Sequence, residues 1–153
     1  MKCFWALVLL LQFVPLANVD AAARQQPQVY ILTEDVDRDA ARCGIDRSSV
    51  ETVAGTALRD NQVLVSPRPV TPYLYVAANL VHGNDGSCSF SIGVSLRRFV
   101  LNLGEFKKSG ASPDDVVICE EKSTGQAPAG SAVALFSQSL KGDIKRCLSK
   151  LEY

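Results

Sequence analysis

Two segments of alternating side chains, separated by a run of turn-forming residues, constrain the fold more than any other feature of the sequence. In the segment 88–96 every second position is apolar, with serine or glycine between, and these positions are Cys88, Phe90, Ile92, Val94 and Leu96. The matching positions of the segment 73–81 are Leu74, Val76, Ala78 and Leu80. The residues between them, 82–86, read His-Gly-Asn-Asp-Gly, which favours a tight turn. Together they predict a long β-hairpin with one buried face.

Two other segments have the spacing of amphipathic helices. In residues 47–60 apolar side chains recur at i, i+3, i+4, i+7 and i+8, and Ser48 and Glu51 have the spacing of a capping box. Near the end of the chain a second stripe consists of Val133, Phe136, Leu140, Ile144, Leu148 and Leu151. Each segment is therefore expected to bury one side against a common core.

Shorter segments complete the pattern. Residues 29–32, 63–65 and 114–119 are rich in β-branched and aromatic side chains and predict strands, with a polar connection over 120–130. The alternation changes phase at residues 97–98, which predicts a bulge or a break. The predicted fold class is α+β: a two-layer sandwich whose mainly antiparallel sheet has about four to five strands, with two helices packed on one face.

The N-terminal residues have the pattern of a secretion signal. A basic start is followed by an apolar run that ends near Pro15, and then by the small residues of 21–23. The apolar run is shorter than the roughly 20 residues that span a bilayer. We expect a signal peptide over 1–23, a flexible leader over 24–28 and a single α+β domain over 29–153. The alternatives are cleavage two residues earlier and an uncleaved anchor.

Four cysteines remain once Cys3 leaves with the signal, and they are Cys43, Cys88, Cys119 and Cys147. An even number of cysteines in an exported chain predicts two disulfides, and four cysteines allow three pairings. Cys88 lies on the apolar side of its strand, so a partner in the helical layer, Cys43 or Cys147, is expected. Four free buried thiols are the alternative.

Composition and spacing argue against several classes of function. The sequence has 16 basic and 16 acidic residues, so charge gives no support for a nucleic acid partner, and no stable membrane anchor is expected after signal cleavage. No cofactor and no metal site are predicted, because His82 is the only histidine and no pair of cysteines is spaced for zinc. The acidic residues of 35–46 resemble a calcium loop only superficially, since Ala40 replaces its glycine, and they predict a solvated, charged edge.

A group of aromatic and basic residues is the candidate binding site. Its members are Tyr73, Tyr75, Phe99, Arg97 and Arg98. They belong to the hairpin, and the tyrosines and Phe99 lie on the side opposite its apolar stripe. If both helices cover the apolar side, this second side needs a cover of loops, a second copy or a partner. The simpler interpretation is that the tyrosines only fill a half-buried sheet face.

Three stretches carry a family resemblance: Cys-Gly-Ile at 43–45, Leu-Arg-Asp-Asn-Gln-Val-Leu-Val at 58–65 and Pro-Tyr-Leu-Tyr-Val at 72–76. They resemble small, uncharacterised exported bacterial proteins with the same order of strand, helix, strands and helix. The resemblance implies a fold and no assigned activity. The element order is also similar to that of periplasmic lipoprotein domains that regulate cell-wall enzymes or assemble secretion pores, which transfers no site.

Three functions remain open. The first is a non-enzymatic secreted or periplasmic domain that binds another envelope or extracellular macromolecule, either a protein partner or a second copy, through the uncovered sheet face or an edge strand. The second is a small secreted hydrolase that uses His82 and a serine. The third is a cystatin-like protease inhibitor. Val-Ala-Gly at 53–55 resembles a segment of the cystatins, although in that family the segment forms a hairpin tip. The sequence favours a protein that is not an enzyme.

Overall fold

The computed structural model describes residues 26–100 and 114–150. Its elements are β1 (Gln28–Thr33), α1 (Arg38–Arg42), α2 (Arg47–Asp60), β2 (Leu64–Val65), β3 (Tyr73–His82), β4 (Ser87–Val100), β5 (Asp114–Pro128) and α4 (Ala129–Leu148). The five strands form one sheet in the order β2-β1-β3-β4-β5. Strand β1 is parallel to both of its neighbours, and the other pairs are antiparallel. The predicted signal peptide and the end of the predicted second helix lie outside the described residues.

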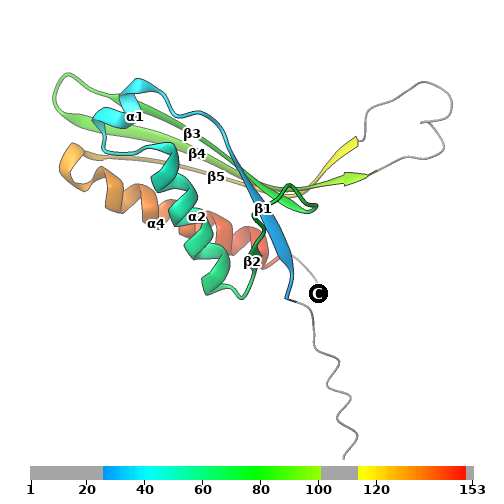
Figure 1. Ribbon diagram of the computed structural model, residues 1–153. Coiled ribbons are helices and arrows are strands. Elements are labelled where there is room, and N and C mark those ends of the chain that lie inside the picture. Colours follow the sequence, from blue (N-terminus) through cyan, green and yellow to red (C-terminus); the bar gives the residue numbers. More distant parts are fainter. Residues whose placement is uncertain (1–25, 101–113, 151–153) are drawn as a thin grey trace, which may run out of the picture.

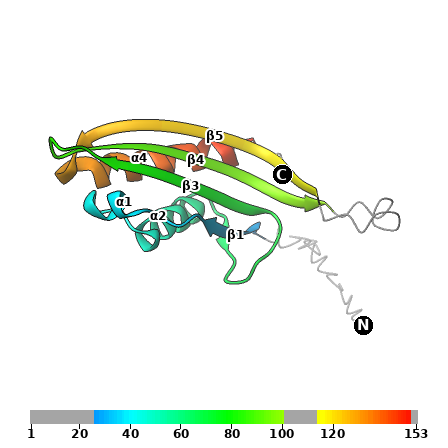
Figure 2. The ribbon, with the colours of Figure 1, turned by 90° about the horizontal axis from the view of Figure 1, so that it is seen from above.

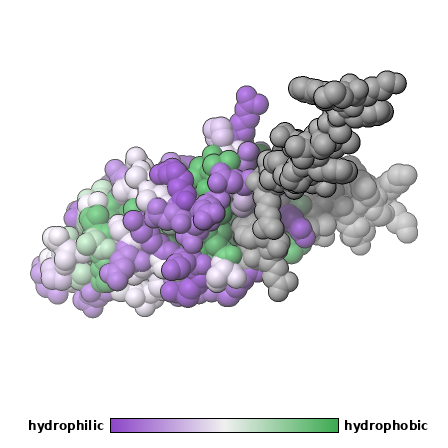
Figure 3. All heavy atoms as spheres, turned by 90° about the horizontal axis from the view of Figure 1, so that it is seen from below, coloured by the Kyte–Doolittle hydropathy of each residue, from purple (hydrophilic) through white to green (hydrophobic). Residues whose placement is uncertain are grey.

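The sheet and the helices form two layers, and the predicted α+β class is confirmed. Helices α2 and α4 lie under one face of the sheet, and α1 lies beside them near the turn between β3 and β4 (Figure 1). Viewed from above, β4 and β5 lie in front of α4 (Figure 2). The ends of β4 and β5 that are remote from this turn extend beyond the helical layer (Figure 1). Viewed from the helical side, hydrophilic side chains are abundant (Figure 3).

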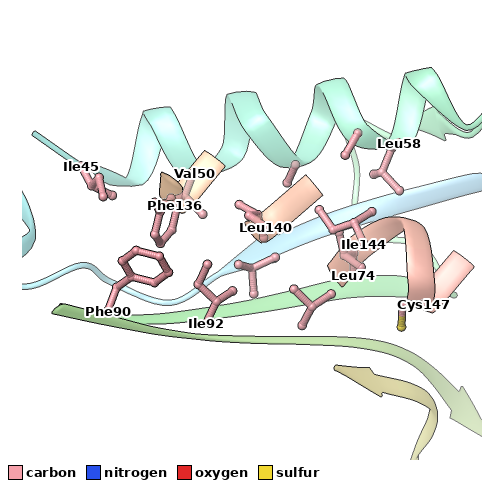
Figure 4. Packing of buried hydrophobic residues seen from close by; sticks show 14 of the residues in the cluster. Ile45, Val50, Leu58, Leu74, Phe90, Ile92, Phe136, Leu140, Ile144 and Cys147 are labelled. Carbon is pink, nitrogen blue, oxygen red and sulfur yellow. The ribbon is translucent and has the colours of Figure 1, made fainter. Parts of the chain in front are cut away.

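The core lies between the sheet and the helices, as the alternation predicts. All five apolar positions of β4 from Cys88 to Leu96 are at most 4% exposed. Helix α4 supplies a matching stripe of Phe136, Leu140, Ile144 and Leu148. The first three of these point toward the sheet (Figure 4). The rings of Phe90 and Phe136 meet edge to face, with their centroids 5.5 Å apart. Burial of these two faces against each other is the main force that holds the layers together.

Both disulfides predicted by the cysteine count are present, and both cross-link separate elements. Cys43, at the end of α1, is bonded to Cys88 at the start of β4, with their Cα atoms 6.0 Å apart. Cys119 on β5 is bonded to Cys147 on α4, with a Cα separation of 5.5 Å. Of the two partners expected for Cys88, Cys43 and Cys147, the structure shows Cys43. Two buried disulfides fit the oxidising compartment that export requires.

The irregularity predicted at residues 97–98 is a β-bulge, and its extra residue belongs to the neighbouring strand. Leu96 pairs with Cys119 and Arg97 pairs with Val117, so Ile118 of β5 has no opposite residue. A bulge of this kind increases the local twist. It lies where the two strands begin to extend beyond the helical layer.

One helix was not predicted, and the cap predicted for another is wrong. Asp35 and Asp37 are exposed, as a solvated, charged edge requires. A short helix, however, begins at Arg38, and Asp37 caps it by accepting a hydrogen bond from the Ala40 amide at 2.9 Å. Helix α2 is capped by Asp46 and Ser49, which accept hydrogen bonds from each other's amides, and not by Ser48 and Glu51. Aspartate and serine compete equally well for an N-cap, so spacing alone did not distinguish the two registers.

The predicted polar connection over 120–130 is also wrong. Strand β5 continues through it to Pro128 and pairs with β4 along its whole length. One of its faces packs on α4 and the other remains in water, so alternate positions are polar without cost. Helix α4 begins directly after it, at Ala129, four residues before the apolar stripe seen in the sequence.

A polar network joins β5 to α4 beside the second disulfide. Asp143 is fully buried, accepts a hydrogen bond from Ser123 at 2.6 Å and is paired with Arg146. Glu121 is paired with Lys150 at 2.6 Å and with Arg146 at 3.2 Å. Because these cations favour the ionised carboxylate, first Lys150 and then Arg146 lower the pKa of Glu121 below its ordinary value.

This network predicts a dependence of stability on acid pH. A carboxyl whose pKa is lowered in the folded state stabilises that state at pH values above its ordinary pKa. This contribution is lost as the pH falls through the lowered pKa. We expect the melting temperature of Glu121→Gln to fall less than that of the wild type between about pH 6 and about pH 3. Thermal unfolding at several pH values measures this. Parallel curves for the two proteins would contradict it.

Candidate functional site

The candidate site lies on the face of the sheet that the helices do not cover, which we call the outer face. Along β3 the outer face carries Tyr73, Tyr75 and Val81, because the alternate residues Leu74, Val76 and Leu80 are buried in the core. Phe99 belongs to the same face, and its side chain is 50% exposed. A large aromatic side chain half in water, beside others, is typical of a contact surface.

An apolar groove of about 430 Å³ opens on the outer face. It is lined by Tyr30, Leu32, Pro69, Val70, Thr71, Tyr73 and Phe99. The prolines of residues 67–72 prevent this segment from continuing either a helix or a ladder, so it forms one wall of the groove. The hydroxyl of Thr71 accepts a hydrogen bond from the Phe99 amide at 3.2 Å, which ties this wall to β4.

The rings in the groove are held in place by contacts beneath and beside them. Tyr73 stacks on Phe99, with ring centroids 5.1 Å apart, and its hydroxyl donates a hydrogen bond to Asp115 at 2.8 Å. Arg97 also binds Asp115, at 3.3 Å, and its guanidinium lies 4.4 Å from the centre of the Tyr75 ring. Burial, and then the hydrogen bond to Asp115, raise the pKa of the Tyr73 hydroxyl. Tyr73 is therefore a neutral, fixed surface.

Of the five residues predicted for the site, four lie together. Tyr73, Tyr75, Arg97 and Phe99 share the outer face, whereas Arg98 is the alternate residue of β4 and points to the other side of the strand. Six contributors were missed: Tyr30, Leu32, Pro69, Val70, Thr71 and Asp115. The first two share the outer face because Tyr30 pairs with Tyr73 and Leu32 pairs with Tyr75, a register that the sequence does not reveal.

His82 lies at the end of β3, beside the turn of residues 83–86. A serine on the far side of this turn, Ser87, donates its hydroxyl hydrogen bond to Asp85 at 2.7 Å. That hydrogen bond, with one from the Ser87 amide, lowers the pKa of Asp85. The arrangement is that of a turn closed by an aspartate, in which the serine is bonded to the acid and not to the histidine.

The remaining sequence candidates have structural roles in the part of the chain that is described. Asp37 and Asp46 cap helices, and Asp35 is paired with Arg47 at 3.1 Å. No group of three or more potential metal ligands occurs in residues 26–100 and 114–150. The Val-Ala-Gly segment at 53–55 lies in the middle of α2, so it cannot form the inserted hairpin tip of a cystatin. Within the same ranges, no helix is long and apolar enough to cross a membrane.

Comparison with known proteins gives no family. No family model matches the chain, and none of the curated proteins matches it. Among solved structures it is similar to a PelC dodecamer from Paraburkholderia phytofirmans, with 15% identity, a TM-score of 0.39 and coverage of 82% of this chain and 85% of that one. It is also similar to a minor lipoprotein from Acinetobacter baumannii, with 8% identity, a TM-score of 0.32 and coverage of 79% and 94%. At these values neither likeness assigns a family or an activity.

Proposed function

We propose that this protein is a non-enzymatic, exported binding domain that holds a protein partner in the groove of its outer face. The observation that carries the proposal is the combination of an apolar groove with aromatic rings that are already fixed. Tyr73 and Phe99 stack on each other, and Asp115 anchors both Tyr73 and Arg97. Because the rings are already fixed, binding loses less side-chain entropy than it would with free rings, which favours affinity.

The chemistry of the groove favours a protein as the occupant. Tyrosine, phenylalanine and arginine are the residue types enriched at the centres of protein interfaces. Tyr30, Tyr73 and Phe99 line the apolar groove. The ion pair of Arg97 with Asp115 adjoins it through the hydrogen bond from Tyr73 to Asp115. An apolar side chain of the partner fits the groove, while polar groups around it can bond to this ion pair. The partner can also be a second copy of this chain.

Two substitutions in the groove are expected to weaken this interaction without unfolding the protein. Leu32→Asp and Phe99→Ser each change a side chain that is exposed by 39% or more, so the melting temperature should change little. Each should weaken binding by about tenfold or more, because residues at the centre of an interface contribute most of its energy. The measurement is affinity purification from host extract, followed by light scattering to determine the mass of the complex. The same partner must be followed across all variants.

Val81→Ser is the matched control for these variants. Val81 is an apolar residue of the same outer face, it is 61% exposed, and it lies next to the turn at the opposite end of β3. The control should retain the partner at the wild-type level. Loss of the partner in Val81→Ser, or its retention in both groove variants, would contradict the proposal.

A further inference from the structure

One edge of β1 is only partly occupied. Strand β2 pairs with Gln28 and Val29, and the chain then turns away at Pro67. The Ser66 amide donates to the Val29 carbonyl at 2.9 Å, whereas on the other edge the Glu34 amide donates to the Val76 carbonyl at 3.0 Å. Main-chain groups of successive residues in a strand point to opposite edges, so those of Ile31 point to the same edge as those of Val29. Within the described residues no strand lies beside Ile31 there.

Helix α2 runs along this open edge and forms a second groove with it. The groove has a volume of about 430 Å³, and we call it the β1–α2 groove. Its lining comes from β1, from one side of α2 and from the end of β2, and includes Ile31, Thr52, Gly55, Arg59, Val65 and Pro67. A Cβ atom added at Gly55 would lie 3.8 Å from both Ile31 and Val65 and 3.4 Å from Arg59. Glycine at this position therefore leaves the floor of the groove open.

The two ends of the groove differ in charge and in access. At one end Arg47 is already neutralised, by Asp35 at 3.1 Å and by Glu51 at 2.9 Å. At the other end Arg59 bonds to the hydroxyl of Thr56 at 3.3 Å, and no carboxylate of the described residues pairs with it. Strand β2 occupies the edge of β1 beyond this end. A chain that ran along the edge would have to stop near Arg59.

We propose that the β1–α2 groove binds the C-terminal residues of an extended peptide, which pairs with the main chain of Ile31 and places its terminal carboxylate at Arg59. Main-chain pairing along an open strand edge is a general mode of peptide recognition. A guanidinium binds a carboxylate through two parallel hydrogen bonds. Because Arg59 lies toward the start of β1, the peptide runs antiparallel to this strand. The proposal does not depend on the groove of the outer face.

The test uses arrays of immobilised hexapeptides with free C-termini and duplicate arrays in which every C-terminus is amidated. Labelled protein should bind peptides of the first array and lose about tenfold or more of this binding on the second, because a hydrogen-bonded charge is removed. In solution, the strongest peptide should bind Arg59→Gln about tenfold more weakly, and should bind the control variant Arg42→Gln, which changes an exposed arginine of α1, as it binds the wild type. Equal binding to both arrays, binding to neither, or an unaffected Arg59→Gln would overturn the proposal.

Two further readouts separate binding from a general loss of structure. The peptide should slow hydrogen exchange at the Ile31 amide and leave the Leu32 amide, which points toward β3, unchanged. Gly55→Ala should weaken peptide binding, because the added methyl group occupies part of the groove. It should also raise the melting temperature, since this methyl group makes ordinary contacts and alanine favours a helix. An Ile31 amide that exchanges equally fast with and without peptide would overturn the pairing.

Discussion

Replacing Cys43 and Cys88 together with alanine lowers the free energy of unfolding by about 4 kcal/mol, because the bond closes a loop of 45 residues in the unfolded chain. Both side chains are buried, so the cavity left by the two sulfur atoms adds to this loss. The bond also holds α1 against the start of β4, and α1 alone is too short to be stable. Chemical denaturation under oxidising conditions measures the loss.

The second disulfide provides the comparison for this prediction. The separation of Cys119 and Cys147 is 28 residues, so the paired alanine variant should lose about 0.4 kcal/mol less than the Cys43 and Cys88 variant. If the first double variant unfolds at the same denaturant concentration as the wild type, the first disulfide does not stabilise the fold by restricting the unfolded chain.

Gly125→Ala lowers the free energy of unfolding by about 3 kcal/mol, the upper part of the range for an overfilled core. Gly125 lies on β5 opposite Phe90, and a Cβ atom added to it would come within 2.9 Å of three carbon atoms of the Phe90 ring. The ring cannot move aside easily, because it is 4% exposed and packs against Phe136. Thermal or chemical unfolding measures the effect.

Two variants test the cause of this loss. Gly130→Ala, in the first turn of α4, adds a methyl group that meets no atom within 4 Å, so it should raise stability by about 0.5–1 kcal/mol. Phe90→Leu introduced together with Gly125→Ala should recover part of the loss, because the smaller side chain makes room. Additive losses in the combined variant would show that the ring is not the obstacle.

The parts of the fold that the sequence predicted are those with one clearly buried side. The hairpin of β3 and β4 follows from alternation alone, and the position of Cys88 on its buried side narrowed the disulfide pairing. Strand β5 was cut short because an edge strand with a wet side has the composition of a loop. Its second half is recognisable only from its pairing with β4.

The candidate site was predicted in part for a related reason. Tyr73, Tyr75, Arg97 and Phe99 belong to adjacent strands of one hairpin, so parity along the chain placed them on one face. Tyr30 and Leu32 come from β1, which pairs with β3 in parallel across 43 residues of sequence, and no local pattern encodes that neighbour. Asp115 joined the site through the pairing of β5 with β4, where a bulge shifts the register. The residues that could not be predicted are therefore those that reach the site through long-range strand pairing.

The groove on the outer face is tested most directly by photo-crosslinking. Phe99 is replaced by p-benzoylphenylalanine, which keeps an aromatic ring in the groove, and Val81 is replaced in the same way as the control. The account predicts that position 99 forms an adduct with one protein in host extract, that Leu32→Asp abolishes this adduct and that position 81 does not form it. An absence of adduct at position 99, or the same adduct from position 81, would contradict the account.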